Sequence, residues 1–117
     1  MKLGGVLISL GRIEEALPLN ERAVQARPDD GLAHSQLGQC YLSLHRLVDA
    51  ERHLKQAKAL DPRHFSFPQL VLAKLYQIRG DESALIHELE EFLEHHPDSD
   101  RVSEVTDWLN RIRAQDE

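Results

Sequence analysis

Histidine is the residue type in this chain best able to bind a metal ion or to move a proton near neutral pH. The 117 residues include seven of them: His34, His45, His53, His64, His87, His95 and His96. A helical zinc motif needs two histidines four positions apart, but the residue four after His87 is Glu91. An expected turn separates His45 from His53. We therefore predict scattered surface histidines and no metal site.

Motifs for nucleophilic catalysis or phosphate binding are missing from the sequence. There is no G-x-S-x-G, G-x-x-x-x-G-K-[ST] or G-x-G-x-x-G segment. The only cysteine, Cys40, has no sequence cue for a basic partner, and one cysteine cannot form an internal disulfide. We therefore predict no catalytic residue, no cofactor and no enzymatic activity.

The charge is acidic and uneven. The net charge is −6, and residues 65–117 carry 12 acids against 5 Lys and Arg, whereas residues 1–64 carry 8 against 9. Scattered bases on such a chain argue against a nucleic-acid partner. No apolar run approaches the about 18 residues that cross a bilayer, and no signal peptide is recognisable, so we expect a cytoplasmic protein without membrane contact. The acids from Glu88 to Glu104 form either a docking patch for a basic partner or, as we favour, a solvated helix face.

Three prolines mark an internal repeat. Pro28, Pro62 and Pro97 are 34 and 35 residues apart. In every unit a leucine lies 25 residues before the proline and a turn residue lies 17 before it. These pairs are Leu3 and Gly11, Leu37 and His45, and Leu72 and Gly80. Landmarks that keep their register across three segments indicate one repeated structural unit.

Within each unit, apolar residues recur every three or four positions, as they do on one face of a helix. In the middle unit one stripe runs from Leu37 to Leu44 and a second from Leu47 to Ala57. Glycine suits the helix end between the stripes, and His45 would occupy that position at some cost in strain. We predict seven helices and no strand, over residues 2–10, 13–27, 31–44, 47–60, 67–79, 82–95 and 100–114.

This pattern resembles the tetratricopeptide repeat, whose motif is W-x2-L-G-x2-Y, then A-x3-F, then P. The middle unit reads His34-x2-Leu37-Gly38-x2-Tyr41, Ala50-x3-Leu54 and Pro62. The first unit reads Leu3-Gly4-x2-Leu7, Ala16-x3-Asn20 and Pro28, and the third reads Gln69-x2-Leu72-Ala73-x2-Tyr76, Leu85-x3-Leu89 and Pro97. No unit has the tryptophan, and Asn20 replaces the usual aromatic residue.

The resemblance implies an all-α fold, a right-handed superhelix of antiparallel helix pairs. We expect a single domain over residues 1–117, with repeats at about 1–30, 31–64 and 65–98. Residues 99–117 would form a capping helix, whose Trp108 we expect to be buried against the third unit rather than available to a ligand. Phe65 and Phe67 precede the third unit, and we expect one or both to cover the seam between units.

In this family the first helices of the units line a concave surface that usually binds an extended or helical peptide. The resemblance therefore implies a non-enzymatic scaffold that binds a protein or peptide segment. The candidate groove residues are Leu32, Ser35, Gln39, Leu42, Ser43, Phe67, Leu70, Lys74 and Gln77. The alternative is a structural capping fragment of a longer solenoid with no ligand of its own. Receptors of chaperone tails use asparagines on these helices, which have none here, so we predict against that subclass.

The first unit is the candidate self-association surface. It begins inside its first helix, so the apolar residues there would have no outer neighbour in this chain. These residues are Leu3, Val6, Leu7 and Leu10. A second copy could cover them in an end-to-end homodimer, and the alternative is a frayed helix on a monomer.

Overall fold

The computed structural model describes residues 2–61, 63 and 67–115, with residues 2–11 described by their backbone alone. Over these ranges the chain forms six helices and no strand, which confirms the all-α prediction. The helices are α1 (Lys2–Ala26), α2 (Gly31–Ser43), α3 (Leu47–Leu60), α4 (Pro68–Arg79), α5 (Glu82–His95) and α6 (Val102–Gln115). In this part of the chain no helix is both long enough and apolar enough to cross a membrane.

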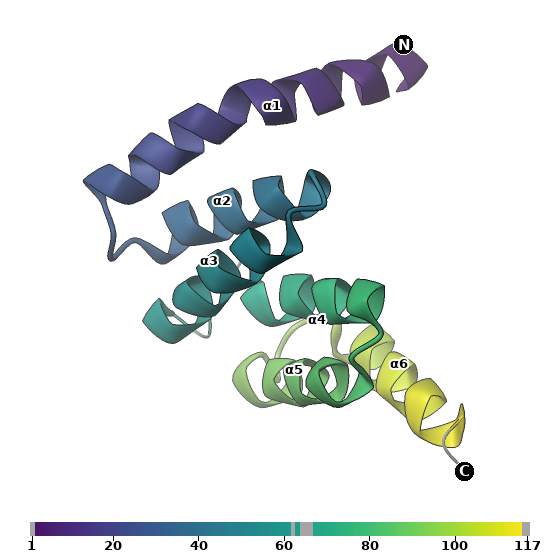
Figure 1. Ribbon diagram of the computed structural model, residues 1–117. Helices are drawn as coiled ribbons and strands as arrows, with labels where there is room; N and C mark the ends of the chain where they lie inside the picture. The colour runs from purple at the N-terminus through teal and green to yellow at the C-terminus, as the bar shows by residue number, and fades with distance from the viewer. Residues whose placement is uncertain (1, 62, 64–66, 116–117) are drawn as a thin grey trace.

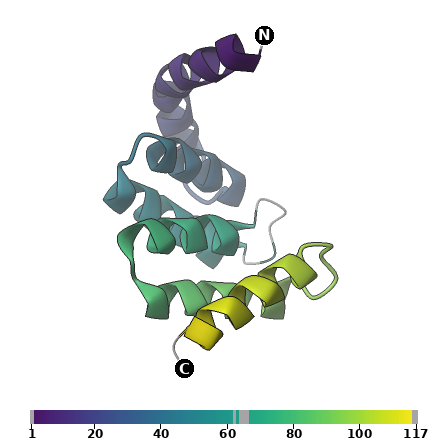
Figure 2. The same ribbon diagram turned by 90° about the vertical axis from the view of Figure 1, so that its right-hand side faces the viewer.

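The helices stack in sequence order as antiparallel pairs (Figure 1). Helix α2 pairs with α3 and α4 pairs with α5, while α1 packs on α2 and α6 packs on α5. Helices α2 and α4, the first helices of the second and third units, are also in contact and lie one above the other in Figure 2. The arrangement is the right-handed superhelix of helix pairs that the repeat implied.

Helix α1 corrects one prediction, because a single helix spans residues 2–26 where we expected two helices, over 2–10 and 13–27. In the other units the turn residue adopts a left-handed conformation, with φ of 58° at His45 and 74° at Gly80. Gly11 instead continues the helix. Glycine permits a left-handed turn but does not require one, and leaving the helix there would give up backbone hydrogen bonds.

Residues at the helix starts explain where α2, α4 and α5 begin. Asp30 caps α2, since its carboxylate accepts hydrogen bonds from the amides of Leu32 and Ala33. Asp81 does the same for α5 through the amide of Ala84. Phe67 precedes α4 with a φ of 52°, and Pro68 follows in the first turn, where proline needs no hydrogen-bond acceptor.

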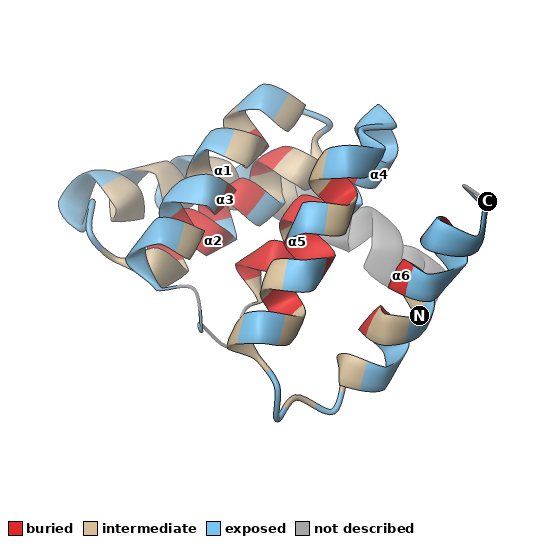
Figure 3. Cartoon of the chain, turned by 90° about the horizontal axis from the view of Figure 1, so that it is seen from below, coloured by how far each residue is buried: buried red, intermediate tan, exposed pale blue. Residues whose placement is uncertain are grey.

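The core is a continuous apolar seam that follows the predicted stripes (Figure 3). In the middle unit Leu37, Ala50 and Leu54 are at most 2% exposed. The same positions of the third unit are filled by Leu72, Leu85 and Leu89, which are also buried. Leu44 and Leu47, next to the turn, are only half-buried. The repeat register deduced from the prolines therefore matches the packing.

Candidate partner-binding face

Four of the nine candidate groove residues are exposed on the two stacked first helices. Gln39 and Ser43 lie on α2, and Lys74 and Gln77 lie on α4. Gln39 and Lys74 occupy equivalent positions, because each lies two residues after the motif leucine of its unit, Leu37 or Leu72. They therefore point to the same side of the stack. None of the four forms a side-chain hydrogen bond or ion pair with another residue that the structure describes.

The other five candidates are more covered. Leu32 and Leu42 are half-buried, whereas Ser35 is 0% exposed and Leu70 is 6% exposed. Ser35 and Leu70 consequently offer no surface to a ligand in this structure, and we leave both out of the face proposed below. Periodicity places these two positions beside the packing stripe, where a neighbouring helix covers them.

Phe67 is half-buried and engaged within the third unit. Its ring meets Phe92 edge to face, with centroids 5.4 Å apart, and meets His96 in the same way at 4.9 Å. Phe92 and His96 are themselves stacked at 4.9 Å. Phe67 therefore closes the end of the α4–α5 pair, while Phe65 lies outside the described residues.

Two hollows flank this face. The first, of about 360 Å³, lies between α1 and α2 and is lined in part by Gln39, Ser43 and Cys40. Within it the Asn20 amide donates to the Sγ atom of Cys40 across 3.0 Å. The second, of about 440 Å³, lies between α4, α5 and α6 and includes Gln77. Sequence patterns did not reveal either hollow, because a hollow depends on how neighbouring helices diverge.

Trp108 lines the second hollow. It is half-buried and packs against the core, so it is neither fully covered by the third unit nor fully free.

His34 departs from the prediction of surface histidines, because it is 5% exposed. Its Nε2 lies 2.7 Å from the carbonyl oxygen of Pro28 and its Nδ1 lies 3.1 Å from Nδ1 of His53. The rings of His53 and Tyr41 are stacked as well. Burial, together with the charges of Arg52 and His34, lowers the pKa of His53. His34 fills the motif position of the tryptophan, and that position was the available signal for its burial.

Glu51 joins the second unit to the third. Its carboxylate accepts 2.7 Å hydrogen bonds from the Tyr76 hydroxyl and the Arg79 guanidinium, and Lys55 lies 3.2 Å away. These donors outweigh the effect of burial and lower the pKa of Glu51 to about 2. Burial and the adjacent carboxylate raise the pKa of Tyr76 well above its usual range. The network fixes α3 against α4.

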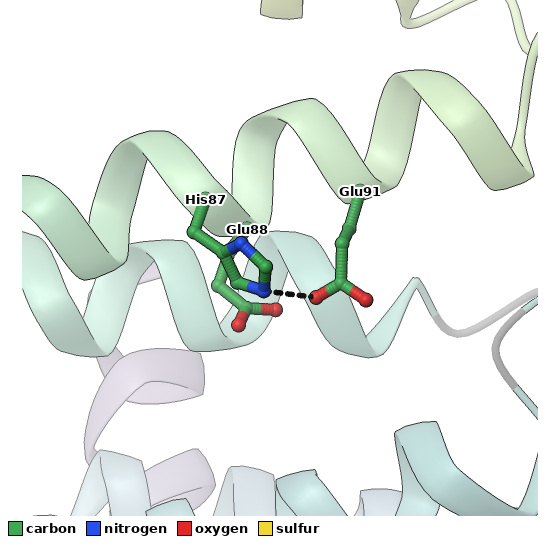
Figure 4. A group of neighbouring side chains, drawn as sticks. All are labelled: His87, Glu88 and Glu91. Atoms are coloured by element: carbon green, nitrogen blue, oxygen red, sulfur yellow. Dashed lines mark ion pairs between the residues drawn. The ribbon is translucent and has the colours of Figure 1, made fainter.

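A second charged cluster on α5 has the residue types of a metal site. Ligand atoms of His87, Glu88 and Glu91 lie within 4.8 Å of one another (Figure 4). However, the Lys58 ammonium of α3 already lies 3.0 Å from Glu88 and 2.6 Å from Glu91. His87 also lies 3.0 Å from Glu91. The lysine supplies the positive charge that these carboxylates require, so we interpret the cluster as a contact between units.

The candidate self-association residues Leu3, Val6, Leu7 and Leu10 lie where only the backbone is described, so the homodimer stays a prediction. Sedimentation at increasing concentration tests it, and a strict monomer with slowly exchanging Val6 and Leu7 amides would contradict both the dimer and the frayed helix.

Successive helix–turn–helix units that contact mainly their neighbours define an α-helical repeat protein, or solenoid. Within that class, the chain belongs to the tetratricopeptide repeat family, whose family model matches residues 7–75.

Two known proteins illustrate the relationship. Over 61 residues the chain is 39% identical to Protein O-mannosyl-transferase Tmtc3 of Drosophila melanogaster, a match that covers 52% of this chain and 7% of the fly protein. Among solved structures, it is similar to the first TPR of Spaghetti (RPAP3) bound to the HSP90 peptide SRMEEVD, with a TM-score of 0.76 and 18% identity. That similarity covers 97% of this chain and 87% of the other, and it shows a shared fold.

Proposed function

We propose that this chain is a non-enzymatic protein-interaction module that binds a protein or peptide segment across α2 and α4. The observation that carries the proposal is the set of exposed polar side chains on these helices: Gln39, Ser43, Lys74 and Gln77. They have no partner among the described residues and occupy one side of two contacting helices. Amide and hydroxyl groups in such a row can pair with the backbone of a bound segment.

Family membership supports this proposal, because stacked helical repeats provide an extended concave binding surface. The structurally similar TPR has a bound peptide, which is a further reason to look for a segment rather than a small molecule. The row on α2 and α4 continues at each end into a hollow, next to Gln39 and next to Gln77.

The experiment is a screen of immobilised peptides, followed by titration of any binder against groove variants. Lys74→Glu and the pair Gln39→Ala with Gln77→Ala should each weaken binding about tenfold or more. Arg52→Glu is the matched control for charge, because Arg52 is 68% exposed on α3, outside the first helices. Equal effects of Lys74→Glu and Arg52→Glu would show that binding depends on net charge and does not use this face.

The second candidate function is structural: the chain would extend a longer solenoid and bind nothing itself. The observation in its favour is that the segment similar to the fly protein is only 7% of that protein's length. This structural function predicts that Lys74→Glu and the glutamine variants, placed in a longer chain that contains this segment, do not change which partners co-purify with that chain.

A further inference from the structure

The acidic half of the chain keeps two cations unpaired. Residues 65–117 contain 5 Lys and Arg among 12 acids. Three are in ion pairs: Arg79 with Glu51, Arg101 with Glu104, and Arg113 with Glu90. Lys74 and Arg111 are exposed and have no ion-pair partner in the part of the chain that the structure describes. In a region so rich in carboxylates, two cations without partners mark a local exception.

Arg111 lies at the edge of the 440 Å³ hollow bounded by α6 and the turn between α4 and α5. Part of the lining consists of buried side chains, because Tyr76, Leu85 and Ile112 line the hollow and are 4%, 6% and 9% exposed. The half-buried Trp108 lines it as well. Its volume falls within the range of about 300–1,000 Å³ that is typical of ligand sites.

The edge of the hollow is polar and continuous with the proposed binding face. Gln77 of α4 and Gln115 of α6 line it and are exposed. Lys74 precedes Gln77 by three positions, and residues so spaced are neighbours on a helix surface. Helix α6 crosses in front of α5 just below α4 (Figure 2). The face and the hollow adjoin because Gln77 belongs to both. Apolar and aromatic side chains with polar ones around them are the usual anatomy of a protein interface.

We propose that this hollow receives an aromatic or large aliphatic side chain of a bound segment, and that an Asp or Glu beside that side chain pairs with Arg111. The inference rests on the proposed function and names the chemistry of its partner, a segment that combines apolar and acidic residues. A guanidinium matches a carboxylate with two parallel N–H donors. The apolar side chain would cover lining residues of the hollow that water can reach when no segment is bound.

Two nearby charges oppose this assignment: Glu82, which also lines the hollow, and Asp107, which lies four positions before Arg111 on α6. Glu82 is the one within the hollow. It lies in the first turn of α5, where the helix dipole favours a negative charge and offsets part of its field. Removing that charge should therefore strengthen the binding of an acidic segment, while removing Arg111 should weaken it.

The probe is an acetylated and amidated fluorescein peptide with one phenylalanine between two aspartates. Anisotropy measures its binding, and an unlabelled copy is followed by the fluorescence of Trp108, the only tryptophan. Arg111→Gln should weaken binding about tenfold, as expected when a charged hydrogen bond is lost. Arg113→Gln makes the same charge change on the same helix, but Arg113 pairs with Glu90, so it should change affinity less than about twofold.

Three further measurements complete the test. Replacing the phenylalanine by alanine should weaken binding about tenfold, and Glu82→Gln should strengthen it. A matched peptide with lysines for the aspartates should bind more weakly than the acidic one. Circular dichroism melting curves establish that every variant is folded.

The inference is overturned if the acidic peptide does not bind at about 1 mM, if Arg111→Gln and Arg113→Gln have equal effects, or if Trp108 fluorescence is unchanged at saturation. It is also overturned if the lysine peptide binds as well as the acidic one. The proposed function has a separate test. If a peptide from the screen still binds less tightly to the Lys74 and Gln39 variants, the proposed function holds even when this inference fails. If these variants bind that peptide as tightly as wild type, the proposed function itself is overturned.

Discussion

A β-carbon added to Gly38 would lie 2.6 Å from Cγ and 2.8 Å from Cδ2 of Leu54. Leu54 is fully buried, and its backbone nitrogen would also lie only 3.3 Å away. The small residue of the first helix and the large residue of the second are thus complementary, and together they set how closely α2 and α3 approach.

Gly38→Ala should accordingly lower the free energy of unfolding by about 1–3 kcal/mol, because Leu54 must move to make room, and Gly38→Leu should lower it further. The control is Gly31→Ala on the same helix, where the added carbon has no neighbour closer than 3.6 Å. That substitution should be neutral or stabilising, since alanine is the better helix former. Urea denaturation measures both, and equal effects would contradict the assigned register.

The apolar periodicity predicted the helix pairs of the second and third units well, because residues that recur at helical spacing lie on one face of a helix and that face packs into the core. Leu37, Ala50 and Leu54 recur at helical spacing, and all three are buried. The patterns failed where a residue is compatible with both a turn and a continuous helix. Gly11 could turn or continue a helix, and the structure continues it.

The candidate face shows the same limit. All of Gln39, Lys74, Ser35 and Leu70 were candidate groove residues on the first helices, but only Gln39 and Lys74 are exposed, whereas Ser35 and Leu70 are covered. Helical spacing defines an angle around one helix, but the width of the covered stripe depends on the neighbouring helix. Arg111 was missed because the hollow beside it depends on how three successive helices, α4, α5 and α6, diverge, which periodicity along one helix does not define.

Substitutions at the turn residues His45 and Gly80 should have opposite effects on stability. Both have left-handed backbones, with φ of 58° and 74°, and this conformation is costly for a residue with a β-carbon. His45→Gly should raise the free energy of unfolding by about 0.5–1 kcal/mol, and Gly80→Ala should lower it by a similar amount.

At Gly80 an added carbon would have no neighbour within 4 Å, so its cost would come from the backbone alone. Thermal melting of the two variants gives the comparison. A stabilising Gly80→Ala would show that the left-handed turn is not maintained in solution.

Glu51→Gln should lower the free energy of unfolding by about 1–3 kcal/mol at pH 7, since it weakens charged hydrogen bonds to Tyr76 and Arg79. The folded pKa of Glu51, about 2, is below its ordinary value of 4.5. Its contribution is therefore complete above pH 4.5 and is lost as the pH falls towards 2. The difference between wild type and variant should shrink over that window.

The control for Glu51 is Glu90→Gln, which breaks the exposed pair with Arg113. Both side chains of that pair are about half exposed, at 52% and 50%. Exposed pairs contribute at most about 1 kcal/mol, and commonly less. If the two variants lose the same stability at pH 7, the Glu51 network does not connect the second and third units in the way that we describe.

The buried environment of His53 predicts a second pH dependence, in a higher window. The pKa of His53 is below its ordinary 6.5 in the folded chain, so the unfolded chain binds a proton more readily. The free energy of unfolding should therefore fall as the pH drops below about 6.5, and His53 should contribute no slope above about pH 7. The charged groups around His53 are Arg52 and Asp49 on its own helix and Glu21 on α1, besides His34 and Tyr41 on α2.

His53→Gln isolates this effect, because it removes the titrating group from the same environment. Glu88 titrates with the opposite sign, since burial raises its pKa, and the difference between variant and wild type cancels its contribution. We expect the stability of the variant to depend less on pH between about 7 and 5. Urea denaturation at four pH values measures the slopes. The control is His95→Gln, because the His95 side chain forms no hydrogen bond, ion pair or ring contact with another residue that the structure describes. Parallel curves for wild type and His53→Gln would show that His53 titrates alike in the folded and unfolded chains, which would contradict this prediction.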